Sequence, residues 1–330
     1  MNTAEILNEC RRLPGVSVNT NEEYAELILS TDSGNGRMRF VPLFDGVTLA
    51  VIEVHSVSWP APKPEKSDPE TKGPLIVNYC IRGRCELVLN DNKSVFLSSG
   101  QISLTEKFAQ SRYIYPGGLY EGIELFIDPE AVRGGVAVLR ENFGLNIEEL
   151  SRRYCPDGDT FIAELRLADE LLKKLYILQS KGNPANKVGM KTGVIDLLAM
   201  LLYDRLLPKE GKSVYYTRFQ VEIARQIESV ISTDLSHSHT VREFAEQFGV
   251  SEGSIKNYFF GVFGQSISRY TMHKRMVYAA GLLEKTDLPV IEIAGSVGYE
   301  SQSKFASAFR REYGTAPFEY RKKKRVSGIL

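Results

Sequence analysis

The residues best suited to chemistry in the first half of the chain are thiols. All cysteines lie there: Cys10, Cys80, Cys85 and Cys155. Arg82-Gly83 predicts a two-residue hairpin turn, which would place Cys80 opposite Cys85 on one face of a sheet. Such a pair could sense oxidants or bind a metal as thiolates, although two reduced, half-buried cysteines are the more common arrangement in a cytosolic protein. Four cysteines are also too few for a disulfide scaffold in a chain of 330 residues.

The small number of histidines and the absence of catalytic motifs argue against an enzyme. A metal-dependent barrel enzyme needs about three histidines and a carboxylate, and His55 is the only histidine before residue 211. His237, His239 and His273 have no cysteine or carboxylate at ligand spacing, so we expect them at the surface or at helix ends. The sequence contains no phosphate-binding glycine loop and no nucleophile elbow. It therefore predicts neither catalysis nor a cofactor nor a metal.

Charge is unevenly distributed along the chain. The net charge is zero overall, but residues 212–330 carry 17 Lys and Arg against 12 Asp and Glu. The remaining residues, 1–211, carry 24 basic and 29 acidic side chains. A basic C-terminal part on a mildly acidic body indicates a polyanionic partner at one end. The N-terminus has no secretory pattern and no segment is long and apolar enough for a membrane span, which predicts a cytoplasmic protein.

The elements of the first 128 residues are predicted to be short antiparallel strands. Residues 1–40 are polar and show no clear period, so we expect irregular structure there. The proline-rich stretch Trp59–Pro74 predicts a loop. Alternating apolar runs predict a small barrel or sandwich with strands at Val47–Val54, Leu75–Ile81, Cys85–Leu89, Val95–Leu97, Gln101–Leu104, Arg112–Tyr115 and Glu121–Asp128.

After Pro129 the apolar period becomes helical. Helices are predicted at Pro129–Phe143, Phe161–Gln179 and Ala185–Leu206, the last two joined as a hairpin through Gly182-Asn183-Pro184. An apolar stripe of Ile195, Leu198 and Leu202 is broader than packing on the neighbouring helix requires, so we expect it to form a dimer interface. The polar segment Pro208–Ser213 is the expected domain boundary.

The last hundred residues repeat one pattern twice. Thr240 with Glu243 forms a capping box, Gly249 ends that helix, and Ser251 can cap a second one. In the repeat, Pro289 suits a first helical position, Gly298 ends the helix and Ser301 caps the next. The two turn glycines are 49 residues apart, and Ile267–Leu283 is predicted to be one continuous helix between the units. This is the pattern of two helix-turn-helix units on a rigid strut.

This C-terminal part resembles the AraC/XylS family of transcription regulators. The segment Gly298–Arg321 is similar to that family's signature, and Arg275-Met276 with Ala279 and Leu282-Leu283 is similar to its linker helix. Ile293-Ala294 before Val297-Gly298 also matches. The resemblance covers about Gln220–Arg325, and as a set these motifs are highly specific.

The resemblance implies which residues contact DNA. Base-reading positions in the family lie early on the second helix of each unit, where this chain has Gly253, Ser254, Lys256, Asn257, Gln302, Ser303 and Lys304. Asn and Gln can pair with adenine, and Lys with guanine, whereas Gly253 has no side chain for reading bases. Arg310 and Arg311 are further expected DNA contacts. Ser307 stands where the family usually has Arg or Lys. The run Arg321–Arg325 is expected to be a solvated tail that adds non-specific contacts with DNA phosphates.

The resemblance also implies the remaining organisation, a two-domain α+β protein. Residues 1–150 would be a cupin-like antiparallel β-barrel that senses an effector, residues 151–211 a helical dimerisation hairpin with its linker, and residues 212–330 an all-α double helix-turn-helix domain. The expected protein is a homodimeric, DNA-binding regulator, and an activator. Its partners would be double-stranded DNA, RNA polymerase and a small-molecule effector, with no membrane and no cofactor.

The effector site is predicted from the aromatic and basic residues of the strands. The sequence segments Asn78–Glu86 and Tyr120–Glu124 are similar to those of a branch of the family that includes siderophore-responsive regulators. Stacking rings and an arginine that fixes an anionic group are expected at Asn78, Tyr79, Arg82, Arg84, Tyr113 and Tyr120, with Trp59 and Tyr115 as further candidates. Two alternatives stay open: a regulator without a ligand, and a thiol or metal sensor that uses Cys80 and Cys85.

Overall fold

The computed structural model describes residues 3–32, 34–60, 74–89, 93–106, 112–128, 130–131, 136–156, 160–164, 169–180, 184–203 and 214–327. The chain forms two compact units, Met1–Tyr215 and Tyr216–Leu330. No helix within those ranges is long and apolar enough to cross a membrane. The predicted linker Pro208–Ser213 and most of the predicted loop Trp59–Pro74 lie outside the described residues. The predicted three-part division of the chain stays a prediction.

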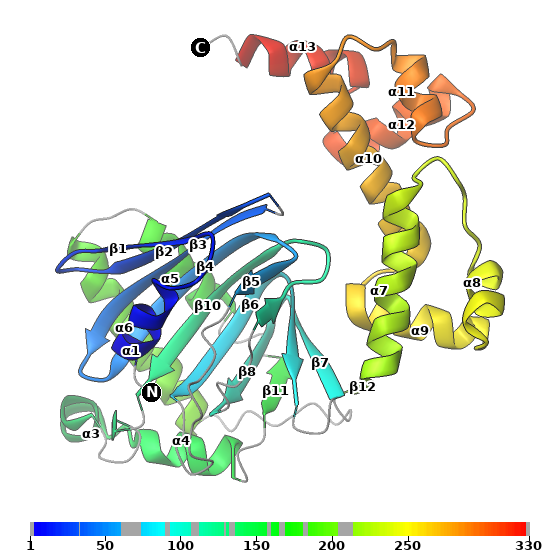
Figure 1. Cartoon of the computed structure of the whole chain (residues 1–330). Coiled ribbons are helices and arrows are strands. Elements are labelled where there is room, and N and C mark those ends of the chain that lie inside the picture. Colours follow the sequence, from blue (N-terminus) through cyan, green and yellow to red (C-terminus); the bar gives the residue numbers. More distant parts are fainter. Residues whose placement is uncertain are drawn as a thin grey trace. The chain divides into compact units, whose positions relative to one another are not determined.

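The first unit is built around a large, curled antiparallel sheet (Figure 1). Its order β1-β2-β3-β4-β10-β6-β7 uses strands Val16–Thr20, Ala25–Thr31, Gly34–Phe44, Val47–Ser56, Tyr120–Ile127, Leu75–Val88 and Lys93–Ser98. Further strands are β5 (Ser58–Pro60), β8 (Gln101–Thr105), β9 (Arg112–Ile114) and β11 (Phe161–Glu164). Among the described strands β1 pairs only with β2, so the pairings do not close the sheet into the predicted barrel.

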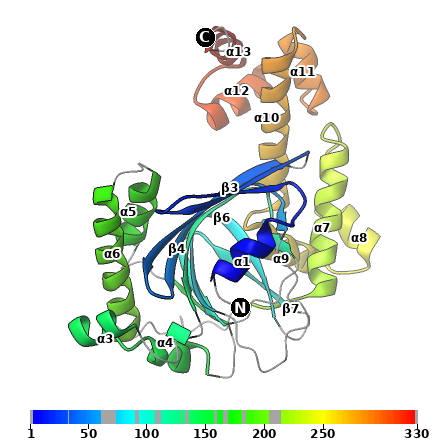
Figure 2. The same cartoon turned by 60° about the vertical axis from the view of Figure 1, so that its left-hand side comes forward.

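Both faces of this sheet are covered, which explains why most positions of β4 and β10 are buried. One face packs against α3 (Ala137–Phe143), α4 (Ile147–Tyr154), α5 (Asp169–Ser180) and α6 (Pro184–Tyr203). The other face packs under α1 (Thr3–Cys10) and around the aromatic side chains of the curl. Figure 2 shows α5 and α6 on one side of the sheet and α1 on the other.

Two local predictions for this unit are wrong. Residues 1–40 are not irregular but supply α1, β1, β2 and part of β3. Phe161 does not begin a helix, since β11 pairs with β8 there, and the following helix begins at Asp169. Edge strands with few apolar residues have a weak pattern of their own and depend on partners distant in sequence.

The predicted hairpin at Arg82-Gly83 is also wrong, because β6 runs unbroken from Leu75 to Val88. Gly83 has φ of 89°, and it lies beside a shift in the register between β6 and β10. A Cβ atom at Gly83 would lie 2.0 Å from the carbonyl oxygen of Leu119. A glycine with positive φ serves a bulge as well as a hairpin turn, so the dipeptide alone could not separate the two.

The second unit is all helical, apart from the two-residue β12 (Tyr216–Thr217) at its start. Its helices are α7 (Arg218–Thr233), α8 (Val241–Phe248), α9 (Glu252–Phe263), α10 (Ile267–Lys285), α11 (Val290–Ser296), α12 (Gln302–Tyr313) and α13 (Pro317–Ser327). The predicted continuous helix between the repeats is confirmed as α10, whose 19 residues extend about 28 Å.

Helix α10 belongs to two separate apolar cores. Its first turns contribute Ile267 and Tyr270 to a core with α7, α8 and α9. Its later turns contribute Met276 and Leu283 to a core with α11 and α12. Figure 1 shows α10 running between these two groups of helices. Because one helix is part of both cores, each helix-turn-helix unit is anchored to the same rigid element.

Candidate nucleic-acid interface

The first helix-turn-helix unit consists of α8, a turn and α9. Thr240 caps α8: its side chain accepts the N–H of Glu243, and the Glu243 carboxylate accepts the N–H of Thr240 at 2.9 Å. Gly249 ends α8 in the left-handed region with φ of 64°. Ser251 then caps α9 by accepting the N–H of Ser254 at 3.1 Å. The predicted capping box, glycine stop and serine cap are all confirmed.

Helix α9 buries Ile255, Phe259 and Val262 and turns its opposite face outward. Lys256 and Asn257 are exposed on that face, and Ser254 is half-buried. Lys256 lies 3.6 Å from the Glu252 carboxylate one turn before it. Phe260 is also exposed on α9. This ring was missed by sequence reasoning, although its position one turn after Lys256 was a readable signal.

The second unit, α11 and α12, follows the same plan with different details. Pro289 is the N-cap of α11 rather than its first helical residue, and it gives no side-chain cap. Gly298 has φ of 77° in the turn. Ser301 caps α12 by accepting the N–H of Lys304 at 3.5 Å, as predicted. The two units therefore present their second helices through equivalent serine caps.

Helix α12 is the more basic of the two exposed helices. Gln302, Ser303 and Lys304 are all exposed at its start, while Phe305 and Phe309 are fully buried. Arg310 and Arg311 follow on exposed positions in the last turn. α12 holds three basic residues and one acidic residue, whereas α9 holds one of each. Among the described side chains none forms an ion pair with Lys304.

Contacts from α10 hold both units in place. The Arg275 guanidinium donates to the carbonyl oxygens of Leu235 at 2.8 Å and His237 at 2.9 Å, which secures the segment between α7 and α8. On the other side, His273 Nδ1 lies 2.6 Å from the Glu312 carboxylate of α12. These contacts fix the exposed faces of α9 and α12 relative to one strut.

The basic run Arg321–Arg325 is largely exposed, as expected, but it is helical rather than a free tail. It lies within α13, where Arg321 and Arg325 donate to the backbone carbonyls of Leu288 and Thr286. Lys324 lies 3.3 Å from the Glu284 carboxylate of α10. Both arginines of the run thus stabilise the connection between α10 and α11, and a role for the run in phosphate contact stays a prediction.

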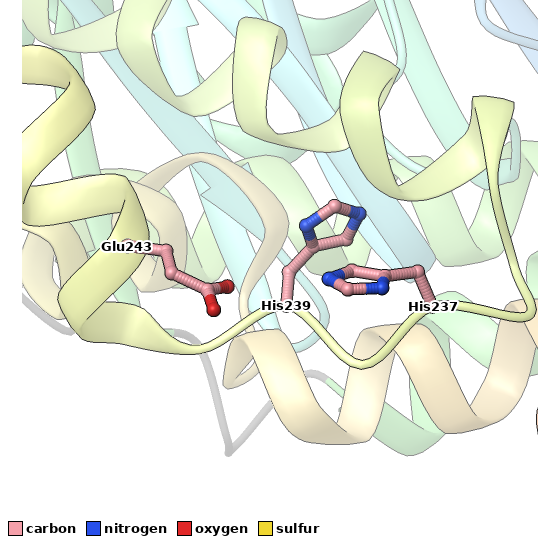
Figure 3. Close-up of side chains that lie close together, drawn as sticks. All are labelled: His237, His239 and Glu243. Atoms are coloured by element: carbon pink, nitrogen blue, oxygen red, sulfur yellow. The ribbon is translucent and has the colours of Figure 1, made fainter.

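A histidine pair lies just before α8 (Figure 3). The ligand atoms of His237, His239 and Glu243 lie within 4.8 Å of one another, so the expectation that no carboxylate stands near these histidines is wrong. The two rings meet edge to face with centroids 4.5 Å apart. Because the Glu243 carboxylate accepts the N–H of Thr240, it already takes part in the cap that begins α8.

The predicted effector residues divide between the two faces of the sheet. Tyr120 and Asn78 are buried on the α1 side, and the Tyr120 hydroxyl donates to Asn78 Oδ1 at 2.5 Å. Tyr113 lines a cavity on that same side. Tyr79 belongs to the core on the opposite face, where its hydroxyl donates to the Asp169 carboxylate on α5. The structure therefore brings three of these residues to one side and leaves Tyr79 on the other.

The two predicted arginines do not line the cavity. Arg82 is largely exposed and lies 3.0 Å from the Glu121 carboxylate. The Arg84 guanidinium lies over the ring of Phe96, 5.5 Å from its centroid. The expectation of an arginine that fixes an anionic group in this cavity therefore lacks support from the geometry.

The cysteine pair is not arranged as predicted, because Cys80 and Cys85 lie along one strand rather than across a hairpin. Both are buried, and burial raises the pKa of the Cys80 thiol to about 12. Burial likewise raises the pKa of Cys85 well above its ordinary value. Thiols that stay protonated react poorly as nucleophiles or ligands.

Two capped helices of equivalent placement, each with an exposed polar face, define a double helix-turn-helix module of the DNA-binding class. The second helix of such a unit enters the major groove, where amide and ammonium groups hydrogen-bond to base edges. A positively charged surface attracts the phosphate backbone. The comparisons with known proteins agree with this class.

The family model described as "Helix-turn-helix domain" matches residues 244–323. Over 77 residues the chain is 35% identical to the regulatory protein SoxS of Salmonella typhimurium, covering 72% of that protein. It is 38% identical over 89 residues to RclR of Escherichia coli, an RCS-specific transcriptional activator, but covers only 31% of it. The Msm operon regulatory protein of Streptococcus mutans is 22% identical over 255 residues, which cover 77% of this chain and 86% of that protein.

The chain belongs to the AraC/XylS family of transcription regulators and binds DNA through its C-terminal helix-turn-helix domain. Most of the similarity to RclR and SoxS is confined to this domain, since the matches cover 27% and 23% of this chain.

Proposed function

We propose that this chain is a transcription activator whose DNA binding is controlled by a small-molecule effector bound in the N-terminal unit. The observation that carries the DNA part is the pair of exposed polar faces, on α9 and α12, attached to the single helix α10. The effector part is supported by an aromatic cavity in the first unit. RclR is named an activator, which favours activation, and an activator would contact RNA polymerase.

Base reading is assigned to the first two turns of α9 and α12. Asn257 and Gln302 fit adenine, Lys256 and Lys304 fit guanine, and Ser254 and Ser303 can hydrogen-bond to either type of base. Arg310 and Arg311, in the last turn of α12, fit phosphate contacts that position the protein without specifying sequence.

A binding-site selection with the full chain tests this assignment. Lys304→Ala should relax the preference at one base pair, at a cost of about 1–3 kcal/mol for the preferred site. The exposed Lys322 on α13 offers the matched control, because Lys322→Ala should weaken binding to all sequences alike. An unchanged consensus for Lys304→Ala would remove that residue from base reading. Affinity should also fall steeply with salt.

A homodimer is also proposed, but not through the predicted stripe. Leu198 and Leu202 are buried in the core between α6 and the sheet, so they already have partners within the protomer. Exposed apolar side chains on the same hairpin, Ile177 on α5 and Val188 on α6, are better candidates for an interface. Val188→Glu should give a monomer in sedimentation, whereas Leu198→Glu should unfold the first unit.

The curled sheet with α1 on one side is proposed to be a cupin-like sensor. Coupling between this sensor and the DNA domain would be measured as a change in operator affinity when a ligand occupies the cavity. A cavity ligand that stabilises the protein but leaves operator binding and transcription unchanged would show that the cavity is not the effector site.

A further inference from the structure

A cavity lies on the α1 side of the sheet, between α1 and the strands. Its unfilled space amounts to about 400 Å³, counting the part open to solvent. Ile6 and Cys10 of α1 contribute to its wall. The rest consists of the apolar residues Leu27, Met38 and Pro60, five aromatic side chains and one acidic one: Phe40, Trp59, Tyr113, Tyr115, Phe126 and Glu124.

Glu124 reaches this cavity from a central strand. β10 lies between β4 and β6, where Glu124 pairs with Ala50 on one side and Asn78 on the other. Alternation along the strand sends Ile123 and Leu125 into the helix-covered core, and Glu124 with Phe126 to the cavity side. Sequence reasoning missed this residue, although a glutamate in a strand that is apolar on both sides was a visible signal.

The Glu124 side chain is half-buried at the cavity. Among the described residues, none donates a hydrogen bond or forms an ion pair with it. Burial without compensation disfavours a charge and raises the pKa of Glu124 to about 7. The carboxyl group is therefore partly ionised near neutral pH, and no described side chain gives it a counter-charge when it is ionised.

The titratable groups that face Glu124 in the described part of the chain cannot supply that counter-charge. They are Cys85 on β6, Tyr113 on β9, Tyr115 in the following turn and Tyr120 on β10. Burial raises the pKa of each of them well above its ordinary value, so all four are neutral near pH 7. Of the described side chains that line the cavity, Glu124 alone changes charge in this range.

We propose that this cavity binds a small organic cation, a protonated amine or quaternary ammonium with an apolar body, through the Glu124 carboxylate and the surrounding aromatic rings. Ring faces attract cations, and the attraction grows where water is excluded. The carboxylate supplies the opposite charge and the orientation, while the apolar wall accepts the body of the ligand. This inference rests on the proposed ligand-controlled function and names the chemical class of the ligand.

The test uses Trp59, the only tryptophan of the chain and part of the cavity wall, as a fluorescent reporter. The full chain is titrated with benzylammonium, benzyl alcohol and benzoate, which share one shape and differ in charge, at pH about 8 where Glu124 is ionised. Benzylammonium should bind at least about tenfold more tightly than either of the others. Tighter binding of benzoate, or no response to benzylammonium, butylammonium and tetramethylammonium alike, would overturn the proposal.

A pair of variants on β10 isolates the carboxylate. Glu124→Gln should lower the affinity for benzylammonium about tenfold or more while keeping that for benzyl alcohol. Glu121→Gln is the matched control, because Glu121 lies on the same strand and pairs with Arg82 at the surface. Equal affinities for benzylammonium in wild type and Glu124→Gln, with both variants folded by thermal unfolding, would contradict the role of Glu124.

The pH dependence gives an independent readout. The ammonium group stays charged from pH about 6 to 8, whereas Glu124 loses its proton as pH rises through about 7. Wild-type affinity for benzylammonium should therefore rise over this range, and binding below pH 7 should release protons. In Glu124→Gln the affinity should be independent of pH. Operator binding measured separately distinguishes the two ideas: amines that bind without changing it support the cation site and argue against effector control.

Discussion

The two helix-turn-helix units share a plan, but their exposed helices differ in charge and in how strongly that charge is already paired. In α9 the ammonium of Lys256 has the Glu252 carboxylate 3.6 Å away. In α12 Lys304 is exposed, and two arginines follow it on the same helix. A lysine that must leave an internal partner gains less from a phosphate or a base than one that has none.

The turns differ as well. Gly249 has open space around it, so its positive φ is the one constraint there. A Cβ at Gly298 would lie 2.4 Å from the Ser236 carbonyl oxygen and 2.9 Å from the Arg275 guanidinium. The turn of the second unit therefore rests on the segment that joins α7 to α8. We therefore predict that the second unit contributes more of the DNA-binding energy, whereas its turn at Gly298 lies against the joint between the units.

The largest effect is expected from breaking the helix that the units share. Val277 is exposed near the middle of α10, so Val277→Pro disturbs the helix while removing little core packing. Proline removes a backbone hydrogen bond and kinks the helix. The two units would then bind as loosely tethered modules, and operator affinity should fall about 100-fold. The readout is fluorescence anisotropy, with Val277→Ala as control and circular dichroism to verify helix content. Equal affinities for the two variants would show that rigidity of α10 is unimportant.

The second effect separates the two turns. Gly298→Ala combines a strained backbone with a clash against main-chain atoms and should cost about 3 kcal/mol of unfolding free energy. Gly249→Ala meets no neighbour and should cost about 1 kcal/mol for its positive φ alone. Urea denaturation of the two variants measures both values. A larger loss for Gly249→Ala would mean that the crowding at Gly298 is relieved by movement of Arg275.

The third effect sharpens the contrast in charge. Lys304→Ala should weaken operator binding about tenfold, and Lys256→Ala by less than about threefold, because Lys256 must first give up its partner. Glu252→Gln should strengthen binding slightly by freeing Lys256 and removing a negative charge from the DNA-facing helix. Titrations at one fixed salt concentration give the three constants. If the two lysine variants lose equal affinity, the ion pair on α9 does not compete with DNA.

The smallest effect concerns the caps of α8 and α11. The N–H of Thr240 lowers the pKa of the Glu243 carboxyl group below its ordinary value. The stabilisation that this contact gives is present above the ordinary glutamate pKa and is lost as pH falls through the lowered pKa. As pH falls through this lowered pKa, the first amides of α8 should become less protected against hydrogen exchange.

The matched control for that cap is in the second unit. Glu292 occupies the same position relative to Pro289, which has no N–H to donate. Glu243→Gln should therefore reduce amide protection in α8 at neutral pH, whereas Glu292→Gln should have a smaller effect on α11. An equal effect at both helices would mean that the capping box contributes little beyond the helix dipole.

The helical repeat was predictable because its signals are local. Thr240 with Glu243, Gly249, Ser251 and Ser301 act on residues within one helical turn, and each forms the contact that its spacing indicates. The strands of the first unit were predicted less well. Gly83 is compatible with both a turn and a bulge, and only the carbonyl of Leu119, 36 residues away, selects the bulge.

The sequence by itself determined the architecture of the DNA-binding part, since caps, turn glycines and apolar periods within about 15 residues specify helices and their buried faces. Tertiary structure alone decided which charges remain available. The pairing of Lys256 with Glu252 was visible as a possibility from spacing, but the use of Arg321 and Arg325 to brace α10 required α13 to fold back. Likewise only the tertiary fold, by placing β10 between β4 and β6 and covering both faces of the sheet, turns Glu124 from an ordinary strand glutamate into a half-buried carboxylate at an aromatic cavity. The reason is physical: a helix cap is satisfied within the segment, whereas burial and pairing of a charge depend on surfaces that distant segments bring together.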